Sequence, residues 1–442
     1  MLTTAPSPPL KGSLSLPGDK SLSHRSALFA AMADGESRIE NFLVAGVTRA
    51  MLEALGRLGF AYQLEGSRLT LRGEGMEGWR KRIQQPQPTL DCGHSATSMR
   101  LLAGALAAAG VPAVLDGSAG LRTRPMDRIV LPLQEMGVPV QSTDGCAPLV
   151  FKKRGESRLR AGIFDLNVAS AQVKSCLLLA GLDADGPVAV REPGPSRDHT
   201  ERLLGGMGAW IERQPLANGG LLVKLAPLAG PLSPLVLHLP GDFSSAAFLI
   251  IAALVTPGSE ICLQDVGLNP TRTGLLEALA EMGADVLVTN RRQRQGEPLG
   301  DIRVRHSRLL ACEVLGPLVV RMIDEFPAFA VAAAFAEGET VVREARELRF
   351  KESDRISALC RQLRAIGVEA VEMDDGFRIR GGAPPAGGEV DPRGDHRLAM
   401  SLAVAGLAAQ APVRVRHPEI VRQSFPGFQA ALIGLGAQIT DG

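Results

Sequence analysis

Charged and hydroxyl-bearing residues recur at points of the sequence where an apolar helix is expected to begin. The first such point is PGDKSLSHR, where a Pro17-Gly18 turn delivers Lys20, Ser21 and Arg25 to a helix start. Free backbone N–H groups and the positive end of the helix dipole favour anions at such a position. An ordinary N-cap followed by a solvated lysine explains the same residues equally well, because serine is a common capping residue.

Two further segments of the first half carry the same kind of chemistry. The segment 91–100, DCGHSATSMR, has small residues that let backbone N–H groups approach a phosphate or a carboxylate. The segment 121–128, LRTRPMDR, places Arg122, Arg124 and Arg128 close together, and arginine forks bind such anions through paired hydrogen bonds. A helix-capping loop and a surface run of charge are the alternatives.

Polar residues also open two helices further along the chain. Ser170 and Gln172 lie in NVASAQVKSCLLLAGL, and Arg197 lies in SRDHTERLL. Such polar groups need partners, which are either a ligand or the helix end itself. The aspartate-led DHTER is typical of a capping sequence, and His199 is expected to be a structural histidine rather than a base.

The second half adds carboxylates to the pattern. Asp324 and Glu325 precede a very apolar helix in RMIDEFPAFAVAAAFAEG, where they act either as caps or as a general base aimed into a cleft. Lys351, Glu352 and Arg355 crowd one turn of LRFKESDR. Glu352 between two cations is either held ionised or poised for proton transfer, or it belongs to a surface ion-pair network.

The last of these motifs, GDHRLAMSLAVAGLAA, opens with Asp395, His396 and Arg397. Several such helix starts aimed at one cleft would form a strong anion trap, which indicates a substrate with phosphate and carboxylate groups. The sequence contains no P-loop, Rossmann fingerprint, kinase signature or Gly-x-Ser-x-Gly elbow. A nucleotide cofactor and a serine nucleophile are therefore not indicated.

The elements that must position these residues form an internal repeat. Six times, a helical apolar pattern ends in a glycine, and an apolar residue and a strand-like stretch follow. This pattern predicts a helix closed by a left-handed C′ glycine and then a strand. Repeats spaced roughly 70 to 85 residues apart predict six α/β units, three in each of two domains. The glycines are Gly59, Gly137, Gly208, Gly283, Gly367 and Gly436.

A coarser duplication divides the chain into two halves. The early segment LSLPGDKSLSHRSALFAAMADGESRIENF resembles LHLPGDFSSAAFLIIAALVTPGSEICLQDV, which ends at Val266. Pro17-Gly18 and Pro240-Gly241 are then the expected crossing points between two pseudo-symmetric halves, and a cleft between such halves favours ligand binding. A duplicated α/β fold without cleft chemistry is the alternative.

Composition narrows the class of protein. The chain has 442 residues, of which 45% are hydrophobic and 21% charged, with a net charge of +1. These values predict a soluble protein of two or three domains and argue against a large nucleic-acid footprint. The six cysteines form no CxxC pair and flank no histidine at metal-ligand spacing, so no metal and no cofactor is expected. We expect neither a signal peptide nor a membrane span, and we expect a monomer in the cytoplasm.

Seven motifs, in order and over nearly the whole chain, resemble those of the EPSP synthase family of enolpyruvyl transferases. The resemblance implies a two-domain inside-out α/β barrel, in which each domain has three repeated βαβαββ-type units with helices inside and sheets outside. It also implies a first domain of 1–18 plus 239–442, a second domain of 19–238, and an active site in the cleft between them. The motifs are PGDKSLSHR, RPMDR, SAQVKS, SRDHTE, IDEFPAFAVAAAFAEGET, FKESDRI and GDHRLAMSLAVAG.

The family's site residues carry over to matching positions. The resemblance implies that shikimate-3-phosphate is bound by Lys20, Ser21, Arg25, Ser170, Gln172, Arg197, Asp324 and Lys351. It implies a phosphoenolpyruvate pocket made by Lys20, Ala96, Arg124, Gln172, Arg355 and Arg397.

The reaction implied is transfer of the enolpyruvyl group of phosphoenolpyruvate to the 5-hydroxyl of shikimate-3-phosphate. The hydroxyl attacks C2 while C3 gains a proton, and phosphate then leaves as C3 loses a proton. Asp324 matches the group that takes the hydroxyl proton, and Glu352 the group that serves C3, with Lys20 assisting. Lys20 and the arginines are expected to stabilise the developing negative charge.

The sequence departs from the family pattern at several positions. His94 replaces a usual Asn, and Ala96 stands where many members have Gly. The Ala96 methyl group is expected to narrow the phosphoenolpyruvate pocket, which predicts weak inhibition by glyphosate, as in class II members. Gln423 stands where a lysine is often found, and whether Arg422 substitutes for it stays open, while Glu347 replaces an Asn of some relatives.

Two other functions compete with this one. A UDP-N-acetylglucosamine enolpyruvyl transferase shares the implied fold, but that family has a cysteine in the loop that reads DGSAGLRTRP here. A non-catalytic polyanion-binding module on the same fold is the second alternative. Carboxylates such as Asp324 and Glu352 among the cations argue against it, because a mere anion binder has no use for them.

Overall fold

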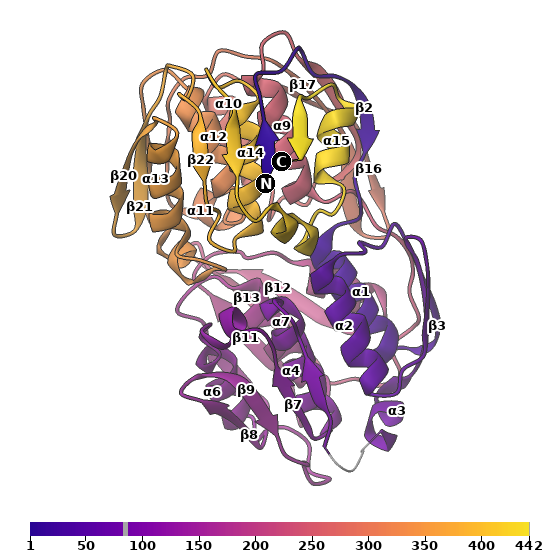
Figure 1. The fold of residues 1–442 in the computed structure, drawn as a ribbon. Coiled ribbons are helices and arrows are strands. Elements are labelled where there is room, and N and C mark those ends of the chain that lie inside the picture. Colours follow the sequence, from indigo (N-terminus) through magenta and orange to yellow (C-terminus); the bar gives the residue numbers. More distant parts are fainter. Residues whose placement is uncertain (83–86, 442) are drawn as a thin grey trace. The chain divides into compact units, whose positions relative to one another are not determined.

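The computed structural model describes residues 1–82 and 87–441, which form two compact units (Figure 1). Unit 1 consists of Met1–Pro17, Pro240–Gln293 and Pro298–Gly442. Unit 2 consists of Gly18–Leu239 and the short segment Arg294–Glu297. The chain therefore begins in unit 1, builds nearly all of unit 2 as one continuous stretch, and then returns to complete unit 1.

The described residues of unit 2 form three four-stranded sheets, ordered β14-β3-β5-β4, β6-β7-β9-β8 and β10-β11-β13-β12. In each sheet the first two strands are parallel and the remaining pairings are antiparallel. The strands are β3 (Asp34–Glu40), β4 (Tyr62–Glu65), β5 (Arg68–Glu74), β6 (Thr89–Asp91), β7 (Ala113–Asp116), β8 (Val140–Thr143), β9 (Cys146–Phe151), β10 (Gly162–Asp165), β11 (Val188–Glu192), β12 (Ile211–Pro215), β13 (Leu221–Leu225) and β14 (Val236–His238).

Unit 1 repeats this arrangement with the orders β16-β17-β15-β2, β18-β19-β21-β20 and β22-β23-β1-β24. Strand β1 lies antiparallel to both β23 and β24, so the first strand of the chain completes the last sheet. The strands are β1 (Leu2–Thr4), β2 (Lys11–Ser15), β15 (Glu260–Gly267), β16 (Asp285–Arg294), β17 (Glu297–Arg305), β18 (Glu313–Val314), β19 (Glu339–Val342), β20 (Glu369–Met373), β21 (Gly376–Arg380), β22 (Gly388–Val390), β23 (Val413–Val415) and β24 (Ile439–Asp441).

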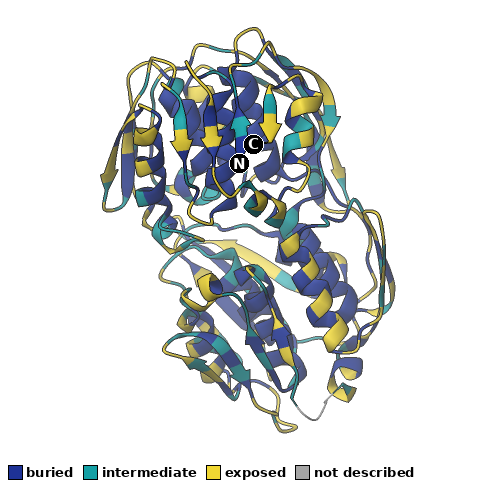
Figure 2. Ribbon diagram, in the orientation of Figure 1, coloured by how far each residue is buried: buried dark blue, intermediate teal, exposed yellow. Residues whose placement is uncertain are grey.

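Within the part of the chain that the structure describes, three helices of each unit lie in its interior, where almost all of their residues are buried (Figure 2). A helix that is apolar on every side is stable only when protein surrounds it, and α9 is buried along all of its length. The βαβαββ units with helices inside and sheets outside are thus confirmed. These helices are α1 (Lys20–Met32), α4 (Ala96–Ala109) and α7 (Ala171–Gly181) in unit 2, and α9 (Phe243–Val255), α12 (Phe326–Phe335) and α14 (His396–Gly406) in unit 1.

The remaining helices are short or amphipathic, with one buried side and one exposed side. In unit 2 they are α2 (Gly46–Arg57), α3 (Gly75–Lys81), α5 (Ala119–Arg122), α6 (Asp127–Glu135) and α8 (His199–Gly206). In unit 1 they are α10 (Gly274–Glu281), α11 (Pro317–Arg321), α13 (Arg355–Ala365) and α15 (Phe428–Gly434), with 3-10 turns η1 (Arg346–Phe350) and η2 (Pro418–Gln423).

The sixfold glycine pattern has the predicted structural role. All six repeat glycines have a positive φ, from 75° at Gly283 to 101° at Gly208 and Gly436. After each one, the next N–H donates to a carbonyl five residues earlier, as Phe60 N donates to Leu55 O. This is the Schellman closure of a helix, and it makes the chain turn from each amphipathic helix into the following hairpin.

In the described part of the chain, no helix combines the length and the apolar character that crossing a membrane requires. Residues 1–82 and 87–441 also contain no group of three or more His, Cys, Asp or Glu side chains placed to hold a metal ion.

Candidate active site

The carboxylates and cations predicted in the second half of the chain meet in unit 1, and we call this group the Arg355 cluster. Arg355 is the first residue of α13 and its side chain is 1% exposed. Its Nε contacts Asp395 Oδ2 at 2.8 Å, its Nη2 contacts Glu352 Oε2 at 2.5 Å, and its Nη1 lies 3.5 Å from Asp324 Oδ1. One guanidinium thus holds three carboxylates from three separate segments.

Two further cations complete the Arg355 cluster around Asp324. Arg397 Nη2 lies 3.6 Å from Asp324 Oδ2, and Arg397 Nη1 donates to the Asp324 carbonyl at 3.0 Å. Lys351 Nζ lies 4.0 Å from Asp324 Oδ1. Asp324 and Lys351 are about one-fifth exposed, whereas Arg355 and Arg397 are buried. Solvent therefore reaches the Asp324 carboxylate and the Lys351 ammonium, whereas the side chains of Arg355 and Arg397 are shielded from solvent.

The charge of Arg355 is fixed by its surroundings. Burial lowers the pKa of this guanidinium, but Asp395, Glu352 and Asp324 together outweigh that effect and raise the pKa far above its ordinary value. Asp395 is fully buried, and its other oxygen caps α14 by accepting from the Arg397 and Leu398 N–H groups. Asp395 therefore both caps α14 and holds the Arg355 side chain.

The first-half residues form a separate group in unit 2, which we call the Arg25 cluster. Arg25 lies on α1 and is buried. Its Nε donates to Thr200 Oγ1 at 2.7 Å, its Nη2 to Ser175 Oγ at 2.9 Å, and its Nη1 to the Ser21 carbonyl at 3.1 Å. Burial lowers the pKa of Arg25 to about 10, although Glu201 and Asp19 oppose this shift.

Gln172 is held in unit 2 by a chain of polar contacts that starts at Arg100. Arg100 Nη1 donates to Gln172 Oε1 at 2.6 Å, and Gln172 Nε2 donates to Thr97 Oγ1 at 2.8 Å. Arg100 also donates to the Pro125 carbonyl at 3.0 Å, next to Arg124. These contacts bring the second, third and fourth predicted motifs together.

The loop before α4, a candidate anion site, also provides the N-cap of this helix, Ser95. Ser95 Oγ accepts from Ser98 N at 3.0 Å, and Gly93 adopts a positive φ of 55°. Ala96 is the first residue of α4 and is buried. His94, which stands in place of the usual Asn, contacts Ser118 Oγ through Nδ1 at 3.1 Å.

Other predicted residues occupy helix starts in unit 2. Lys20 is the first residue of α1, whose N-cap is Asp19, and Ser21 follows it. Ser170 caps α7 through a 3.5 Å contact from Val173 N. Arg124 and Arg197 are half-buried in the loops that precede α6 and α8.

Several expectations from the sequence are wrong. Asp198 is the N-cap residue of α8 but makes no side-chain cap, because its oxygens accept instead from Arg202 and Arg213. Glu325 does not cap α12 either, since its buried side chain accepts from Ser244 Oγ. By contrast, the predicted proximity of Glu352 and Arg355 is observed, since Glu352 Oε2 lies 2.5 Å from Arg355 Nη2, although α13 begins only at Arg355.

Three residues at the edge of the predicted motifs have surface or half-buried positions. Arg122 pairs with Asp116 at 2.5 Å at an exposed position, which fits the surface-charge alternative. The partner of the Arg122 side chain, Asp116, also belongs to unit 2. In η2 of unit 1, Arg422 is exposed and Gln423 is half-buried.

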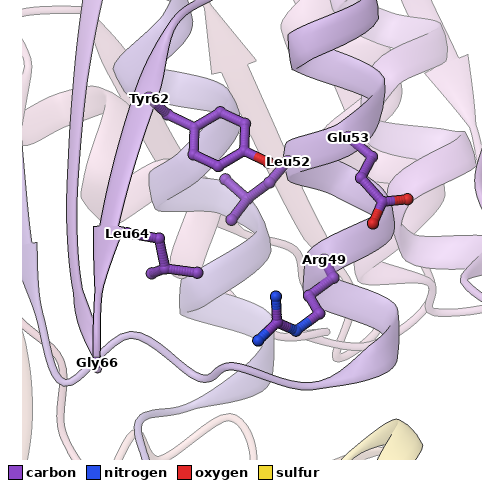
Figure 3. A pocket seen from close by; sticks show the side chains of 6 residues that line it. All are labelled: Arg49, Leu52, Glu53, Tyr62, Leu64 and Gly66. Carbon is purple, nitrogen blue, oxygen red and sulfur yellow. The ribbon is translucent and has the colours of Figure 1, made fainter.

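A surface hollow of about 410 Å³ lies in unit 2 and contains none of the predicted site residues (Figure 3). It is formed by α2 and by the β4–β5 hairpin, with the Tyr62 ring and the Arg49 guanidinium directed toward the same space. It is distinct from the Arg25 and Arg355 clusters, and the lining residues are Arg49, Leu52, Glu53, Tyr62, Leu64 and Gly66.

Sequence reasoning missed the residues that hold the arginines and Gln172. Arg100 and Asp395 stand in quoted motifs, but no role was assigned to them. The available signal was a charged residue inside an otherwise apolar helix, as at Arg100 and Lys174, because a buried charge requires a partner. Lys174 is fully buried and pairs with Glu192 and Glu201.

The six four-stranded sheets and six buried helices of residues 1–82 and 87–441 form the fold of the enolpyruvyl transferases. It matches the enolpyruvyl transferase NikO of Streptomyces tendae with a TM-score of 0.77 and 20% identity, over 99% of this chain and 98% of that one. It matches EPSP synthase from Acinetobacter baumannii with a TM-score of 0.85 and 39% identity, over 100% of this chain and 99% of that one.

The sequence comparisons narrow the class to one family. The model of the EPSP synthase (3-phosphoshikimate 1-carboxyvinyltransferase) family matches residues 4–432. The 3-phosphoshikimate 1-carboxyvinyltransferase of Geobacter sp. (strain M21) is 46% identical over 435 residues, which cover 98% of both chains. That of Coxiella burnetii (strain RSA 493) is 45% identical over 430 residues, 96% of this chain and 94% of its relative. The chain belongs to the EPSP synthase family.

Proposed function

We propose that this chain transfers the enolpyruvyl group of phosphoenolpyruvate to the 5-hydroxyl of shikimate-3-phosphate and releases phosphate. This reaction serves the shikimate pathway, which leads to chorismate and the aromatic amino acids. The observation that supports it most directly is the Arg355 cluster, where a partly exposed Asp324 lies among Lys351, Arg355 and Arg397. Cations bind the two anionic substrates, and a carboxylate among them supplies a base.

We propose that the Arg25 and Arg355 clusters bind the same pair of substrates. The shikimate-3-phosphate ligands are Lys20, Ser21, Arg25, Ser170, Gln172, Arg197, Asp324 and Lys351. The phosphoenolpyruvate ligands are Lys20, Ala96, Arg124, Gln172, Arg355 and Arg397. The division of the chain into 1–18 plus 239–442 and 19–238, with the active site in the cleft between these domains, is part of this proposal.

In the proposed mechanism, Asp324 accepts the proton of the 5-hydroxyl as its oxygen attacks C2 of phosphoenolpyruvate. Glu352 gives a proton to C3, which forms the tetrahedral intermediate, and takes a proton back as phosphate leaves. Lys20 assists, and the arginines stabilise negative charge as it develops. Glu352 is a quarter exposed, which leaves its carboxylate accessible beside the buried Arg355.

Substitution of the two carboxylates tests these roles. Asp324→Asn and Glu352→Gln should each lower kcat by about 100-fold or more, because a general acid–base group contributes that much. Glu337→Gln, an exposed residue just beyond α12, is the control and should stay within about twofold. Steady-state phosphate release is the measurement, and a kcat close to wild type in either site variant would remove that residue from the mechanism.

We also propose that the chain is of the glyphosate-insensitive class II type. Ala96 is buried at the first position of α4, and its methyl group narrows the space in which the inhibitor must fit beside the bound acceptor. The variant Ala96→Gly should increase glyphosate inhibition by about tenfold or more, because one methyl group in a tight pocket is worth that much. Inhibition of the wild type at micromolar glyphosate and moderate phosphoenolpyruvate would contradict the proposal.

We place the protein in the cytoplasm as a monomer. All six cysteines are free, and burial raises the pKa of the Cys92 and Cys176 thiols. Free thiols fit a reducing compartment. Light scattering at micromolar concentration checks the monomer, and a doubled mass would refute it.

The decisive experiment measures phosphate release with alternative acceptors. Shikimate-3-phosphate should support turnover, whereas UDP-N-acetylglucosamine should not. Turnover with the nucleotide sugar alone would assign the chain to the related transferase reaction. Tight calorimetric binding of both substrates without phosphate release would instead assign it to the polyanion-binding alternative.

A further inference from the structure

A fully buried group of three charges lies in unit 2, and we call it the Lys174 triad. Lys174 Nζ lies 2.8 Å from Glu192 Oε1 and 2.7 Å from Glu201 Oε1. The three side chains are 0%, 0% and 3% exposed. They join α7, the end of β11 and α8, which are three consecutive elements of one βαβαββ unit.

The neighbours of the Lys174 triad in sequence hold Arg25. Ser175 follows Lys174 on α7, and Thr200 precedes Glu201 on α8. The two hydroxyl oxygens are 2.6 Å apart, and Arg25 donates to both of them. The ion pair therefore sets the spacing of the two helices at the level where their hydroxyl groups bind the arginine.

The other acid of the Lys174 triad holds the segment that carries Arg197. Glu192 Oε1 accepts from Ser196 N at 3.1 Å, and Glu192 Oε2 accepts from Ser196 Oγ at 2.6 Å. Lys174 Nζ lies 3.5 Å from the Ser196 carbonyl. Arg197 is the next residue, so its backbone position depends on this contact.

Arg25 keeps donors for a ligand while it is held in this way. A guanidinium has five N–H donors, and Arg25 uses one on Nε, one on Nη1 and one on Nη2 within unit 2. Among the described residues, one N–H on each Nη has no partner, which is an arrangement for paired hydrogen bonds to a phosphate or a carboxylate. The hydroxyl groups of Ser175 and Thr200 thus define the direction in which the two remaining N–H groups of Arg25 point.

Stability alone does not account for three buried charges. Removal of such groups from water costs several kcal/mol per ion, and well-packed apolar residues of similar volume are often at least as stable. We propose that Lys174, Glu192 and Glu201 are positioning residues that fix the direction of Arg25 and Arg197 toward the anionic groups of the acceptor substrate. This inference rests on the proposed function, because it takes the acceptor to be a phosphate ester bound by these arginines.

Electrostatics support the geometry. Burial lowers the pKa of Arg25, Glu201 and Asp19 raise it, Arg197 lowers it and Glu297 raises it. Glu201 lies on α8, Asp19 is the N-cap of α1, Arg197 lies in the loop before α8, and Glu297 is the first residue of β17. Loss of the Glu201 charge should therefore lower this pKa further, so that acceptor binding weakens at a lower pH than in the wild type.

The test compares Glu201→Gln with Arg154→Met. Arg154 forms an ion pair with Asp183 in the same unit, and their side chains are 10% and 13% exposed. Glu201→Gln should raise the KM for shikimate-3-phosphate by about tenfold or more and leave the KM for phosphoenolpyruvate within about twofold. Arg154→Met should leave both constants unchanged, since Arg154 contacts neither arginine of the proposal. An unchanged acceptor KM in folded Glu201→Gln would overturn the inference.

A triple variant guards against misfolding. Lys174→Met combined with Glu192→Gln and Glu201→Gln removes all three charges of the Lys174 triad together, so none of them is left without its counter-ion and the variant should fold. Its acceptor KM should rise as in the single variant, and a folded triple variant with wild-type KM refutes the positioning role.

Calorimetric titration of shikimate-3-phosphate without phosphoenolpyruvate separates this inference from the proposed function. If the wild type binds the acceptor but releases no phosphate, the proposed function fails, and weaker binding by Glu201→Gln still supports the positioning role. If the wild type turns over and Glu201→Gln matches it in binding, only the positioning role fails. If the wild type binds no acceptor, both fail.

Discussion

At the scale of single residues, Arg355 is the centre of the second-half cluster because it contacts three carboxylates at once. A lysine keeps the charge but offers a point contact in place of a planar fork. Lysine at this position cannot hold Glu352, Asp395 and Asp324 in their present directions. The arrangement therefore depends on the shape of the guanidinium as well as on its charge.

Arg355→Lys should lower kcat/KM for phosphoenolpyruvate by about 100-fold or more. A matched control lies in η1, seven residues past the end of β19. Arg349 also bridges two carboxylates, Asp354 at 2.7 Å and Glu372 at 2.9 Å. Arg349→Lys should change kcat/KM by less than about threefold. Steady-state kinetics with both variants measure the difference, and equal losses would mean that the Arg355 effect is general destabilisation.

His24 gives a prediction for pH. Burial lowers its pKa from 6.5 to about 3, with Lys20 and Arg25 adding to the shift and Asp19 opposing it. The unfolded chain then binds one proton more than the folded chain between these values, so folding stability must fall as the pH falls from 6.5 toward 3. The expected slope from this residue is about 1.4 kcal/mol per pH unit.

The measurement is urea unfolding of wild type and His24→Gln between pH 6.5 and 4. Glutamine does not titrate, so the variant should lose less stability per pH unit than the wild type by about that slope. Parallel pH profiles would show that His24 is protonated in the folded protein. His24 Nδ1 contacts Ser98 Oγ at 3.2 Å, and both residues are buried.

At the scale of elements, the contact of α4 with α7 in unit 2 depends on a glycine. A Cβ at Gly104 would lie 2.4 Å from the Cys176 carbonyl oxygen and 2.9 Å from Leu179 Cβ. At Gly205 of α8, a Cβ would meet nothing within 4 Å. Glycine is a poor helix former, so alanine is disfavoured only where its Cβ meets a close contact, as at Gly104.

Gly104→Ala should destabilise the protein by about 1 to 3 kcal/mol, because added atoms in a packed core force neighbouring groups to shift. Gly205→Ala should be neutral or stabilising by up to about 1 kcal/mol. Thermal unfolding followed by circular dichroism distinguishes the two variants. A neutral Gly104→Ala would mean that α4 and α7 can separate without cost.

Elements that a local sequence pattern defines could be predicted from the sequence. Elements that depend on pairing with residues far away in the sequence could not. The glycines after the amphipathic helices predict their own closure, because a left-handed residue is needed at that position. Strand β1 has three residues and pairs with β23 and β24, more than 400 residues away in sequence. No local pattern in Leu2–Thr4 indicates that partner.

In the candidate site too, features with a local signal could be predicted from the sequence, and features that depend on distant residues could not. Helix starts rich in Lys, Arg and Ser predict anion binding, since the dipole and the free N–H groups are local properties. The side chains that hold those groups, such as Asp395 on Arg355 and Thr200 on Arg25, come from other segments. Their distances depend on packing of the inner helices, which residue types alone do not define.

At the scale of the whole molecule, each unit has its own hydrophobic core. Units with separate cores can unfold in separate transitions. If both clusters bind the same substrates, ligands should stabilise both transitions by mass action, by about 2.7 kcal/mol at a ligand concentration 100 times Kd.

Differential scanning calorimetry with shikimate-3-phosphate and the unreactive analogue phospholactate measures this effect. Both transitions should move to higher temperature, or merge into one. A shift of a single transition would mean that only one cluster holds the ligands, which contradicts the joint use of the Arg25 and Arg355 clusters.

The strand order of the last sheet has a consequence for synthesis on the ribosome. Strand β1 is synthesised more than 400 residues before its partners β23 and β24. Gly18–Leu239 emerge as one block and lack only Arg294–Glu297 of unit 2, so this block can fold while translation continues. The nascent chain must therefore carry β1 unpaired until β23 and β24 have been made.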